Sequence, residues 1–331
     1  MLVVTPNLCV DRTVRISELV PGGVSRPERA VATLGGKGVN VARVGRALGH
    51  DVPIVGFLPQ GDAGRLRALA AREGARLVEV RVAGEARVAT ILLETSGRVT
   101  VLNEPGPDVD AADWQRLVEQ LRTLLPAHAT MSCSGSVPPG SPPEAYAMCV
   151  EAAHAAGAFA VVDGQAHALA AALEMEPDVV TPNLAEAEAV LVGSRGELVE
   201  PSGPDVPERA IESARALTAR GARHAVVTAG SRGAAYVSSG GDSAWCSAPA
   251  VEVKSPVGAG DALVGGLLHR IEAGDPVPEA VRFAVAVASA SCEQELAGGL
   301  DPRRALALSA LVSLAPVLGD TAAGAAPAGR R

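Results

Sequence analysis

The chain has 331 residues, of which 48% are hydrophobic and 20% are charged, and its formal net charge is −8. This composition is typical of a globular protein with a buried core and excludes a largely disordered chain. The negative charge argues against a nucleic-acid partner, which usually contacts a basic face, and against lasting contact with an anionic membrane.

The cysteines and the first residues indicate the compartment. Five cysteines are scattered without a CxxC pair, which favours reduced thiols over a disulfide framework. No run of about 20 apolar residues predicts a membrane span. The opening MLVVTPN is strand-like and lacks the basic and apolar regions of a secretory signal. We therefore expect a soluble, cytoplasmic protein.

Short apolar runs alternate with amphipathic helical patterns along most of the chain. The predicted strands cover residues 1–7, 51–58, 158–164, 178–183 and 224–230. The predicted helices cover residues 39–49, 63–74, 113–125, 143–157 and 208–221. Such alternation predicts an α/β fold, a doubly wound and mostly parallel sheet flanked by helices. We expect one domain over residues 1–312.

Two segments interrupt this alternation. Residues 11–33 lack helical periodicity, and residues 79–106 alternate between apolar and polar side chains around a glycine turn. Together they predict a small antiparallel β-sheet that forms a lid over a site or a dimer contact. The low-complexity segment 313–331 is predicted to be a disordered tail.

GGKGVN, residues 35–40, stands directly before a predicted helix. Its glycines allow the backbone to approach a ligand, and the free N–H groups of a helix start favour anions or sugar oxygens. Lys37 could reach a phosphate, and Asn40 could bind hydroxyls. The alternative is a tight turn in which Asn40 is a helix N-cap. Neither GxGxxG nor a P-loop is present.

VGAGD, residues 257–261, is the more informative stretch. A turn of small residues before a helix directs successive N–H groups outward and forms an anion hole, aided by the helix dipole. Asp261 would then be a base beside that hole. An Asp at the N-cap position is equally compatible with the local sequence.

Two further stretches follow predicted strands. In TPNLAEAE, residues 181–188, Asn183 and Glu186 could hold hydrated Mg²⁺ near phosphates, or they could simply cap a helix. The strand 224–230 ends in Thr228 and Gly230, and ligands bind at the carboxyl ends of strands in open α/β sheets.

The order of these motifs resembles the PfkB (ribokinase-like) family of carbohydrate kinases. The resemblance rests on LGGKGVNVARVGRALG, TPNLAE, VVTAGSRGA and VGAGD, and it extends from about residue 5 to residue 300. VDRTVRISELVPGGVSR, LNEPGP and SGSVPPG are similar to the phosphosugar branch, which includes 1-phosphofructokinase and tagatose-6-phosphate kinase. Thr181, where the family commonly has Lys, is a departure.

The resemblance implies a kinase that uses ATP and Mg²⁺ to phosphorylate a ketohexose monophosphate. Fructose 1-phosphate is the first expectation; tagatose 6-phosphate, fructose 6-phosphate, an unphosphorylated sugar or nucleoside, and a non-catalytic sugar-phosphate sensor are the alternatives. A homodimer through the lid sheet is also implied.

The resemblance further implies a role for each matched residue. Asp261 is the catalytic base, and its neighbours Gly258, Ala259 and Gly260 form the anion hole. The residues implied to contact ATP are Asn183, Glu186, Thr228 and Gly230, the first two also being associated with Mg²⁺. The residues implied to bind sugar are Asp11, Gly36, Lys37 and Asn40. Arg87 and Arg26 are implied to contact the phosphate that the substrate already carries.

Overall fold

The computed structural model describes residues 1–192 and 202–317. A ten-stranded sheet has the order β14-β13-β12-β11-β10-β9-β8-β1-β4-β5. The pairs from β5 to β11 are parallel, and those from β11 to β14 are antiparallel. Its strands are β1 (Leu2–Val4), β4 (Pro53–Pro59), β5 (Arg76–Val82), β8 (Thr130–Gly135), β9 (Phe159–Gly164), β10 (Val179–Val180), β11 (His224–Thr228), β12 (Gly233–Ser238), β13 (Ser243–Ser247) and β14 (Ser313–Pro316).

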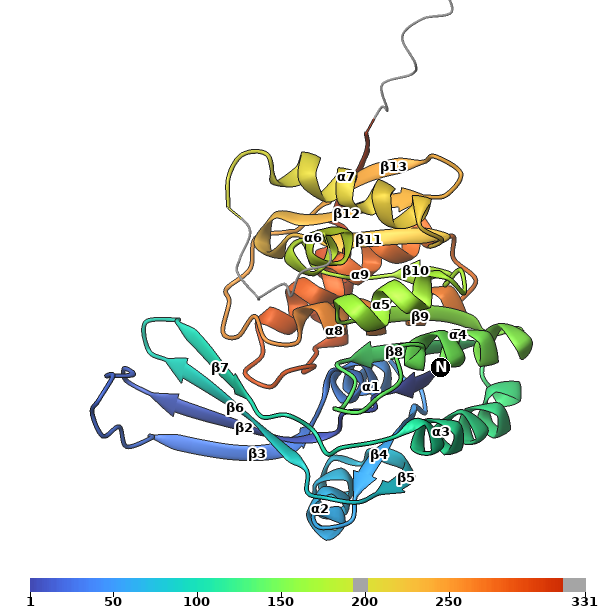
Figure 1. The fold of residues 1–331 in the computed structure, drawn as a ribbon. Coiled ribbons are helices and arrows are strands. Elements are labelled where there is room, and N and C mark those ends of the chain that lie inside the picture. The colour runs from blue at the N-terminus through green and yellow to red at the C-terminus, as the bar shows by residue number, and fades with distance from the viewer. Residues whose placement is uncertain (193–201, 318–331) are drawn as a thin grey trace, which may run out of the picture.

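Helices cover both faces of this sheet (Figure 1). One face packs against α3 (Ala111–Leu124), α4 (Ala145–Ala155), α5 (Ala166–Leu173), α6 (Leu184–Val192) and α7 (Val206–Ala219). The other packs against α1 (Lys37–Ala47), α2 (Ala63–Glu73), α8 (Ala259–Glu272), α9 (Val277–Cys292) and α10 (Pro302–Ser309). In β1, Leu2 and Val4 enter the first core and Val3 the second. A strand covered on both faces must be apolar throughout, which explains the uninterrupted apolar runs.

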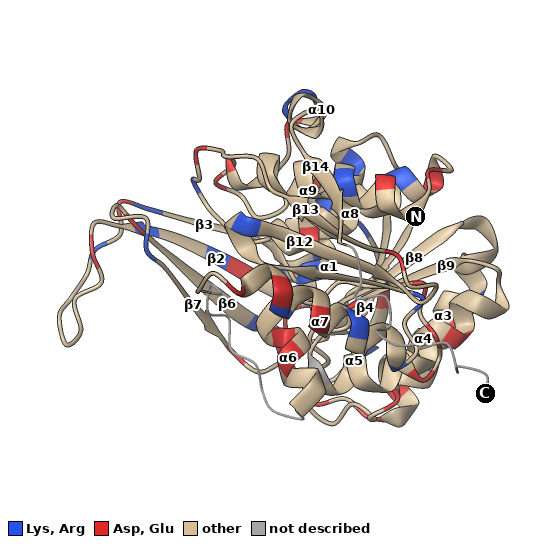
Figure 2. Cartoon of the chain, turned by 90° about the horizontal axis from the view of Figure 1, so that it is seen from above, with Lys and Arg blue, Asp and Glu red and all other residues tan. Residues whose placement is uncertain are grey.

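The lid is a second sheet that projects from one side of the body (Figure 1). Its order is β3 (Arg29–Gly35), β2 (Cys9–Ile16), β6 (Arg87–Glu94) and β7 (Val99–Asn103). The two outer pairs are antiparallel, as expected, whereas β2 and β6 pair in parallel. Lys and Arg residues are interspersed with Asp and Glu residues over the lid and the body in the view of Figure 2.

The doubly wound fold is confirmed, and two predicted boundaries are wrong. Residues 79–82 belong to β5 of the large sheet, where they pair with β4, so the second lid segment begins later than predicted. Residues 313–316 form β14 and pair with β13, so the predicted disordered tail does not begin at residue 313. Residues 318–331 lie outside the described residues. No helix in the described part of the chain is long and apolar enough to span a membrane.

Helices α1 and α8 approach each other closely because α8 carries Gly265 at the contact. A Cβ atom placed on Gly265 would lie 2.7 Å from Cγ1 of Val44 in α1. Real Cβ atoms do not approach other atoms this closely, so the interhelical distance requires a glycine. The close packing matters because each helix carries a predicted site residue near its start, Asn40 in α1 and Asp261 in α8.

The first prediction concerns this packing. Gly265→Ala is expected to lower the free energy of unfolding by about 1–3 kcal/mol, because the added methyl group overpacks the α1–α8 contact. Gly64→Ala in α2 is the matched control, since a Cβ there meets nothing within 4 Å. The control should be neutral or stabilising by up to about 1 kcal/mol. Urea denaturation measures both, and equal effects of the two substitutions would contradict the prediction.

Candidate active site

The predicted site residues gather where the parallel strands end and three helices begin. Asp163 lies near the carboxyl end of β9, and Thr228 ends β11. Thr228 pairs with Asn183 in an isolated parallel bridge, immediately before α6. Helices α1, α6 and α8 all begin at this edge (Figure 1). This is the edge at which open α/β sheets bind ligands.

Helix α8 begins without a side-chain cap. Gly258 is its N-cap with a φ of 84°, and no side chain of the described chain caps the first turn. Asp261 is the third helical residue and not the N-cap, so the plain capping interpretation of Asp261 is wrong. Its carboxylate is buried and accepts a 2.7 Å hydrogen bond from Nδ2 of Asn40. The side chain of Asp261 therefore contacts α1 and does not cap the first turn of α8.

The uncapped first turn of α8 has room for an anion. The first turn of any helix leaves N–H groups without intrahelical acceptors. A Cβ placed on Gly260 would meet nothing within 4 Å, so open space faces this residue. A Cβ on Gly258 would lie 3.0 Å from the amide nitrogen of Gly298, which places the loop around residue 298 directly beside the turn. The geometry suits a phosphate at the helix start.

Helix α1 begins in the same way. Gly36, with a φ of 119°, is its N-cap, and Asn40 lies inside the helix. The alternative that Asn40 is an N-cap is therefore wrong. Lys37 is the first helical residue, and its Nζ lies 3.3 Å from Oδ2 of Asp163 and 3.4 Å from Oε1 of Glu186. The ammonium group thus faces the carboxylates at the carboxyl end of β9 and at the start of α6.

Burial dominates the protonation behaviour of these groups. Burial raises the pKa of Asp261 to about 7, a rise that Asp163 and Asp11 reinforce and that Lys37 and Asn40 oppose. Burial also raises the pKa of Asp163, against the lowering effect of Lys37. Burial alone would lower the pKa of Lys37, but the surrounding carboxylates raise it overall. Asp261 can therefore exchange a proton near neutral pH, as a general base must.

Asn183 and Glu186 form a capping box at the start of α6. The backbone N–H of Asn183 donates to Oε2 of Glu186 at 3.0 Å, and the N–H of Glu186 donates to Oδ1 of Asn183 at 2.9 Å. The second carboxylate oxygen of Glu186 faces Lys37. The two interpretations left open by the sequence are therefore compatible, because capping occupies one oxygen of Glu186 and leaves the other directed into the site.

The oxygen atoms at this edge fit a hydrated Mg²⁺ rather than a fully protein-bound ion. Oγ1 of Thr181 is buried and has no hydrogen-bond partner among the described residues, and Oδ2 of Asp163 is buried with Nζ of Lys37, 3.3 Å away, as its ion-pair partner. No cluster of three or more metal-ligating side chains occurs within residues 1–192 and 202–317. Mg²⁺ commonly binds through one or two carboxylates while it keeps waters and substrate phosphates as its other ligands.

The base of the lid supplies the predicted sugar-binding side chains. Asp11 in β2 is buried, accepts a 3.2 Å hydrogen bond from Sγ of Cys9, and packs against Gly35. Arg87 in β6 donates from Nε and Nη2 to the backbone oxygen of Asn7, both at 3.3 Å. Burial raises the pKa of Asp11, and the Cys9 hydrogen bond and the positive charges of Arg43 and Arg87 oppose part of this rise.

Two predicted residues lie toward the periphery. Arg26 is in the exposed loop between β2 and β3, at the outer end of the lid, and no contact of Arg26 with the other predicted residues occurs in the described chain. Gly230 is exposed two residues beyond β11, with a φ of 58° at the start of a short 3₁₀ turn. The role of Arg26 toward a substrate phosphate stays a prediction.

Sequence reasoning missed polar residues beside the site. Nδ2 of Asn7 donates to Oγ of Ser136 at 3.0 Å, while Oδ1 of Asn7 is buried and has no hydrogen-bond partner in the described part of the chain. Arg43 and Glu73 form a buried ion pair behind Asn40. The only sequence signal for Arg43 is its spacing of three residues from Asn40, one turn along the same helix. Nothing local pointed to Glu73, which lies in α2.

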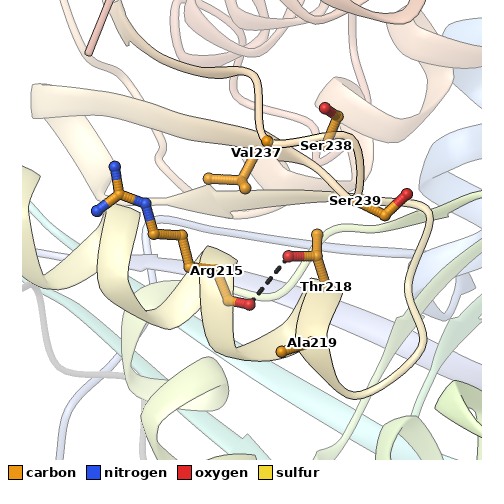
Figure 3. A pocket seen from close by; sticks show the side chains of 7 residues that line it. Arg215, Thr218, Ala219, Val237, Ser238 and Ser239 are labelled. Carbon is orange, nitrogen blue, oxygen red and sulfur yellow. Dashed lines mark hydrogen bonds between the residues drawn. The ribbon is translucent and has the colours of Figure 1, made fainter. Parts of the chain in front are cut away.

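A separate hollow of about 270 Å³ lies between α7 and the β12–β13 hairpin (Figure 3). Its lining includes Arg215, Thr218, Val237 and Ser238. Ser238 pairs with His224 at the amino end of β11, so the hollow is at the opposite edge of the sheet from Thr228. None of the predicted site residues lines it.

Comparison with known proteins agrees with this geometry. Residues 4–303 match the model of the pfkB family carbohydrate kinases. The chain is 32% identical to a 1-phosphofructokinase of Escherichia coli K12, over 95% of this chain and 97% of the relative. It is 35% identical to a 1-phosphofructokinase of Rhodobacter capsulatus, over 86% and 87% of the two chains.

Solved structures extend the agreement to the fold. Phosphofructokinase-2 from Escherichia coli in complex with fructose-6-phosphate superimposes with a TM-score of 0.80 at 26% identity, and the match covers 94% of this chain and 98% of that chain. The family match spans the helix starts, the strand ends and the lid described above. The chain therefore belongs to the pfkB family of carbohydrate kinases.

Proposed function

We propose that this carbohydrate kinase transfers the γ-phosphate of ATP to a hydroxyl of fructose 1-phosphate and forms fructose 1,6-bisphosphate. The proposal is supported by the 1-phosphofructokinases to which the chain is 32–35% identical over most of both chains. Within the structure, one observation carries it. The buried carboxylate of Asp261 is held by Asn40 in the first, uncapped turn of α8, beside open space at Gly260.

In the proposed reaction Asp261 accepts the proton of the acceptor hydroxyl. The hydroxyl oxygen then bonds to the γ-phosphorus, while the bond from that phosphorus to the β–γ bridging oxygen breaks and ADP leaves. The N–H groups of Gly258 and Gly260 stabilise the negative charge on the transferred group, and that of Ala259, which donates to the backbone oxygen of Pro256 at 3.3 Å, would exchange this acceptor for the phosphate. Phosphoryl transfer depends mainly on positioning and charge stabilisation, and the start of α8 combines both with a base.

The cationic group of the proposed site is Lys37. Lys37 contacts Asp163 and Glu186 and is close enough to lower the pKa of Asp261. We assign it to the phosphate side of the site, where it would face the γ-phosphate. Asn183, Glu186 and Asp163 would hold Mg²⁺ through its water ligands. When bound, this ion neutralises phosphate charge.

The sugar phosphate is assigned to the base of the lid. Asp11 would accept hydrogen bonds from sugar hydroxyls, and Arg87 would pair with the phosphate that the substrate carries. Oδ1 of Asn7, which is buried and has no hydrogen-bond partner among the described residues, would accept from a third polar group of the sugar. Dimerisation through the lid sheet and a cytoplasmic location stay predictions.

The second prediction tests the base. Asp261→Asn keeps the shape of the side chain but cannot accept a proton, so kcat is expected to fall roughly 100- to 10,000-fold. Asp275→Asn is the control, because this carboxylate pairs with Arg270 beyond the opposite end of α8. ADP release with fructose 1-phosphate measures both variants. A kcat near that of the wild type for Asp261→Asn would exclude the proposed mechanism.

The third prediction concerns pH. Asp261 acts as a base only when ionised, and burial raises its pKa to about 7. The value of kcat/KM is therefore expected to fall as the pH drops through about 7 and to level off above it. The residual activity of Asp261→Asn should lack this acid limb. A wild-type profile that is flat between pH 5 and 8 would contradict the prediction.

The fourth prediction separates a phosphosugar acceptor from an unphosphorylated one. Arg87→Ala is expected to raise KM for fructose 1-phosphate on the order of 10- to 100-fold, with little change in KM for ATP, because a charged hydrogen bond to phosphate is lost. Arg12→Ala is the control, since Arg12 neighbours Asp11 in β2 but is exposed on the other face of the lid.

A substrate screen completes this test. Tagatose 6-phosphate, fructose 6-phosphate and free fructose are compared with fructose 1-phosphate by ADP release. Fructose 1-phosphate should show the highest kcat/KM. Equal kcat/KM for free fructose, together with an unchanged KM in Arg87→Ala, would favour a kinase of unphosphorylated sugars.

A further inference from the structure

A buried arginine stands behind the proposed base. Arg43 lies in α1, one turn after Asn40, and its side chain is 7% exposed. Its Nη1 donates to Oδ1 of Asn40 at 2.6 Å and to the backbone oxygen of Ala297 at 3.0 Å. Its Nη2 also donates to the backbone oxygen of Leu34, the penultimate residue of β3. One guanidinium group thus joins three separate parts of the chain.

Glu73 at the end of α2 holds this guanidinium in place. Its Oε2 accepts hydrogen bonds from Nε and Nη2 of Arg43 at 3.0 and 2.7 Å. Its Oε1 accepts from the backbone N–H of Leu34 at 2.8 Å. Burying an arginine is costly unless its charge is paired and its donors are satisfied, and Glu73 meets both conditions. The pair is therefore rigid, because each carboxylate oxygen has its own partner.

The guanidinium determines which way the Asn40 amide points. An arginine side chain only donates hydrogen bonds, so the atom of Asn40 that faces it must be the oxygen. With Oδ1 turned toward Arg43, Nδ2 faces Asp261 and donates to Oδ2 of its carboxylate. A rotated amide would place Oδ1 against that carboxylate and Nδ2 against the guanidinium. Both contacts would be repulsive.

The same guanidinium also anchors the loop beside the anion hole. A Cβ on Gly298 would lie 2.8 Å from Cα of Asn40, and a Cβ on Gly258 would lie 3.0 Å from the nitrogen of Gly298. The loop is therefore packed between the α1 helix and the start of α8. The hydrogen bond from Arg43 to Ala297 fixes this loop at the adjacent residue.

We propose that Arg43, held by Glu73, is a positioning residue for phosphoryl transfer. It orients the Asn40 amide toward Asp261 and holds the 297–298 loop against the first turn of α8. The inference rests on the proposed role of Asp261 as the base. It assigns no contact with substrate to Arg43, whose side chain acts only through Asn40 and through the loop.

Loss of this orientation has a consequence for pH dependence. The charged groups that act on Asp261 are Lys37 in α1, Asp163 in β9 and Asp11 in β2; the Asn40 hydrogen bond lowers the pKa of Asp261. When the amide is free to rotate, this lowering is lost and the acid limb of kcat/KM moves to higher pH. If Arg43 acted on Asp261 only through its positive charge, a lysine at position 43 would preserve the acid limb.

The fifth prediction uses this difference. In the full chain, Arg43→Lys keeps the charge but cannot bridge Asn40, Ala297 and Glu73 at once. Arg43→Lys and Arg43→Gln are both expected to lower kcat about 10- to 100-fold and to move the acid limb upward by about half a pH unit or more. KM for ATP should change little, because Arg43 is not assigned to the nucleotide side.

Arg46→Gln is the matched control. Arg46 is one turn further along α1 and donates to the backbone oxygen of Glu73 at 3.3 Å, but it does not contact Asn40. It should lower stability without moving the acid limb. Glu73→Gln is the second test, for use if Arg43→Gln does not fold. This substitution keeps the guanidinium of Arg43 but removes the charge that pairs with it. A smaller shift of the acid limb in the same direction is expected.

The outcomes separate this inference from the proposed function. If Asp261→Asn keeps a normal kcat, the assigned base is wrong and the role of Arg43 falls with it. If Asp261→Asn is inactive while the folded Arg43 and Glu73 variants have the acid limb of the wild type, only the positioning role is overturned. A third outcome is that Arg43→Lys keeps the kcat and pH profile of the wild type while Arg43→Gln shows the shift. Arg43 would then act only through its charge, which would also overturn the proposal.

Discussion

The hydrogen bond between Asn40 and Asp261 is the contact on which the site depends. It joins the starts of two helices that are more than 200 residues apart in the sequence. It can form only because Gly265 brings α8 against α1, and it places a carboxylate in a buried position where ionisation is unfavourable. The fold thus raises the pKa of the proposed base to about 7 and holds it in the uncapped first turn of α8, where the proposed anion hole lies.

The charges around this contact balance only in part. Within residues 1–192 and 202–317, Lys37 is the one cation in contact with Asp163 and Glu186, and Asp261 lies near enough to interact with it. Three carboxylates therefore share one ammonium group, and burial raises the pKa of both Asp163 and Asp261. Such an arrangement favours a ligand that brings additional positive charge together with its phosphates. A nucleotide that enters with a hydrated metal ion meets this requirement.

The fold could be predicted from the sequence because the apolar runs coincide with strands that are buried on both faces. Apolar runs such as that in β1 must be covered on both faces, and this alone implies helices on each side of a parallel sheet. The pairing of β14 with β13 could not be read in the same way, because short edge strands have weak patterns. Asp261 remained ambiguous for a similar reason. Whether Asp261 is the N-cap or the third helical residue depends on where α8 begins, and the burial of its side chain depends on α1, which is distant in the sequence.

The role of Glu73 could not be predicted from the sequence around it. Glu73 is 30 residues from Arg43, and its importance arises only when α2 packs against β3 and the last residue of α2, Glu73, meets Arg43 of α1. In the folded chain, Glu73 connects the base of the lid to the residues around Asp261. Strand β3 leaves the lid at Gly35, and α1 begins two residues later at Lys37. Glu73 and Arg43 both bond the backbone of Leu34 at this junction, and Arg43 continues to Asn40. The base of the lid and the residues that hold Asp261 therefore belong to one hydrogen-bond network.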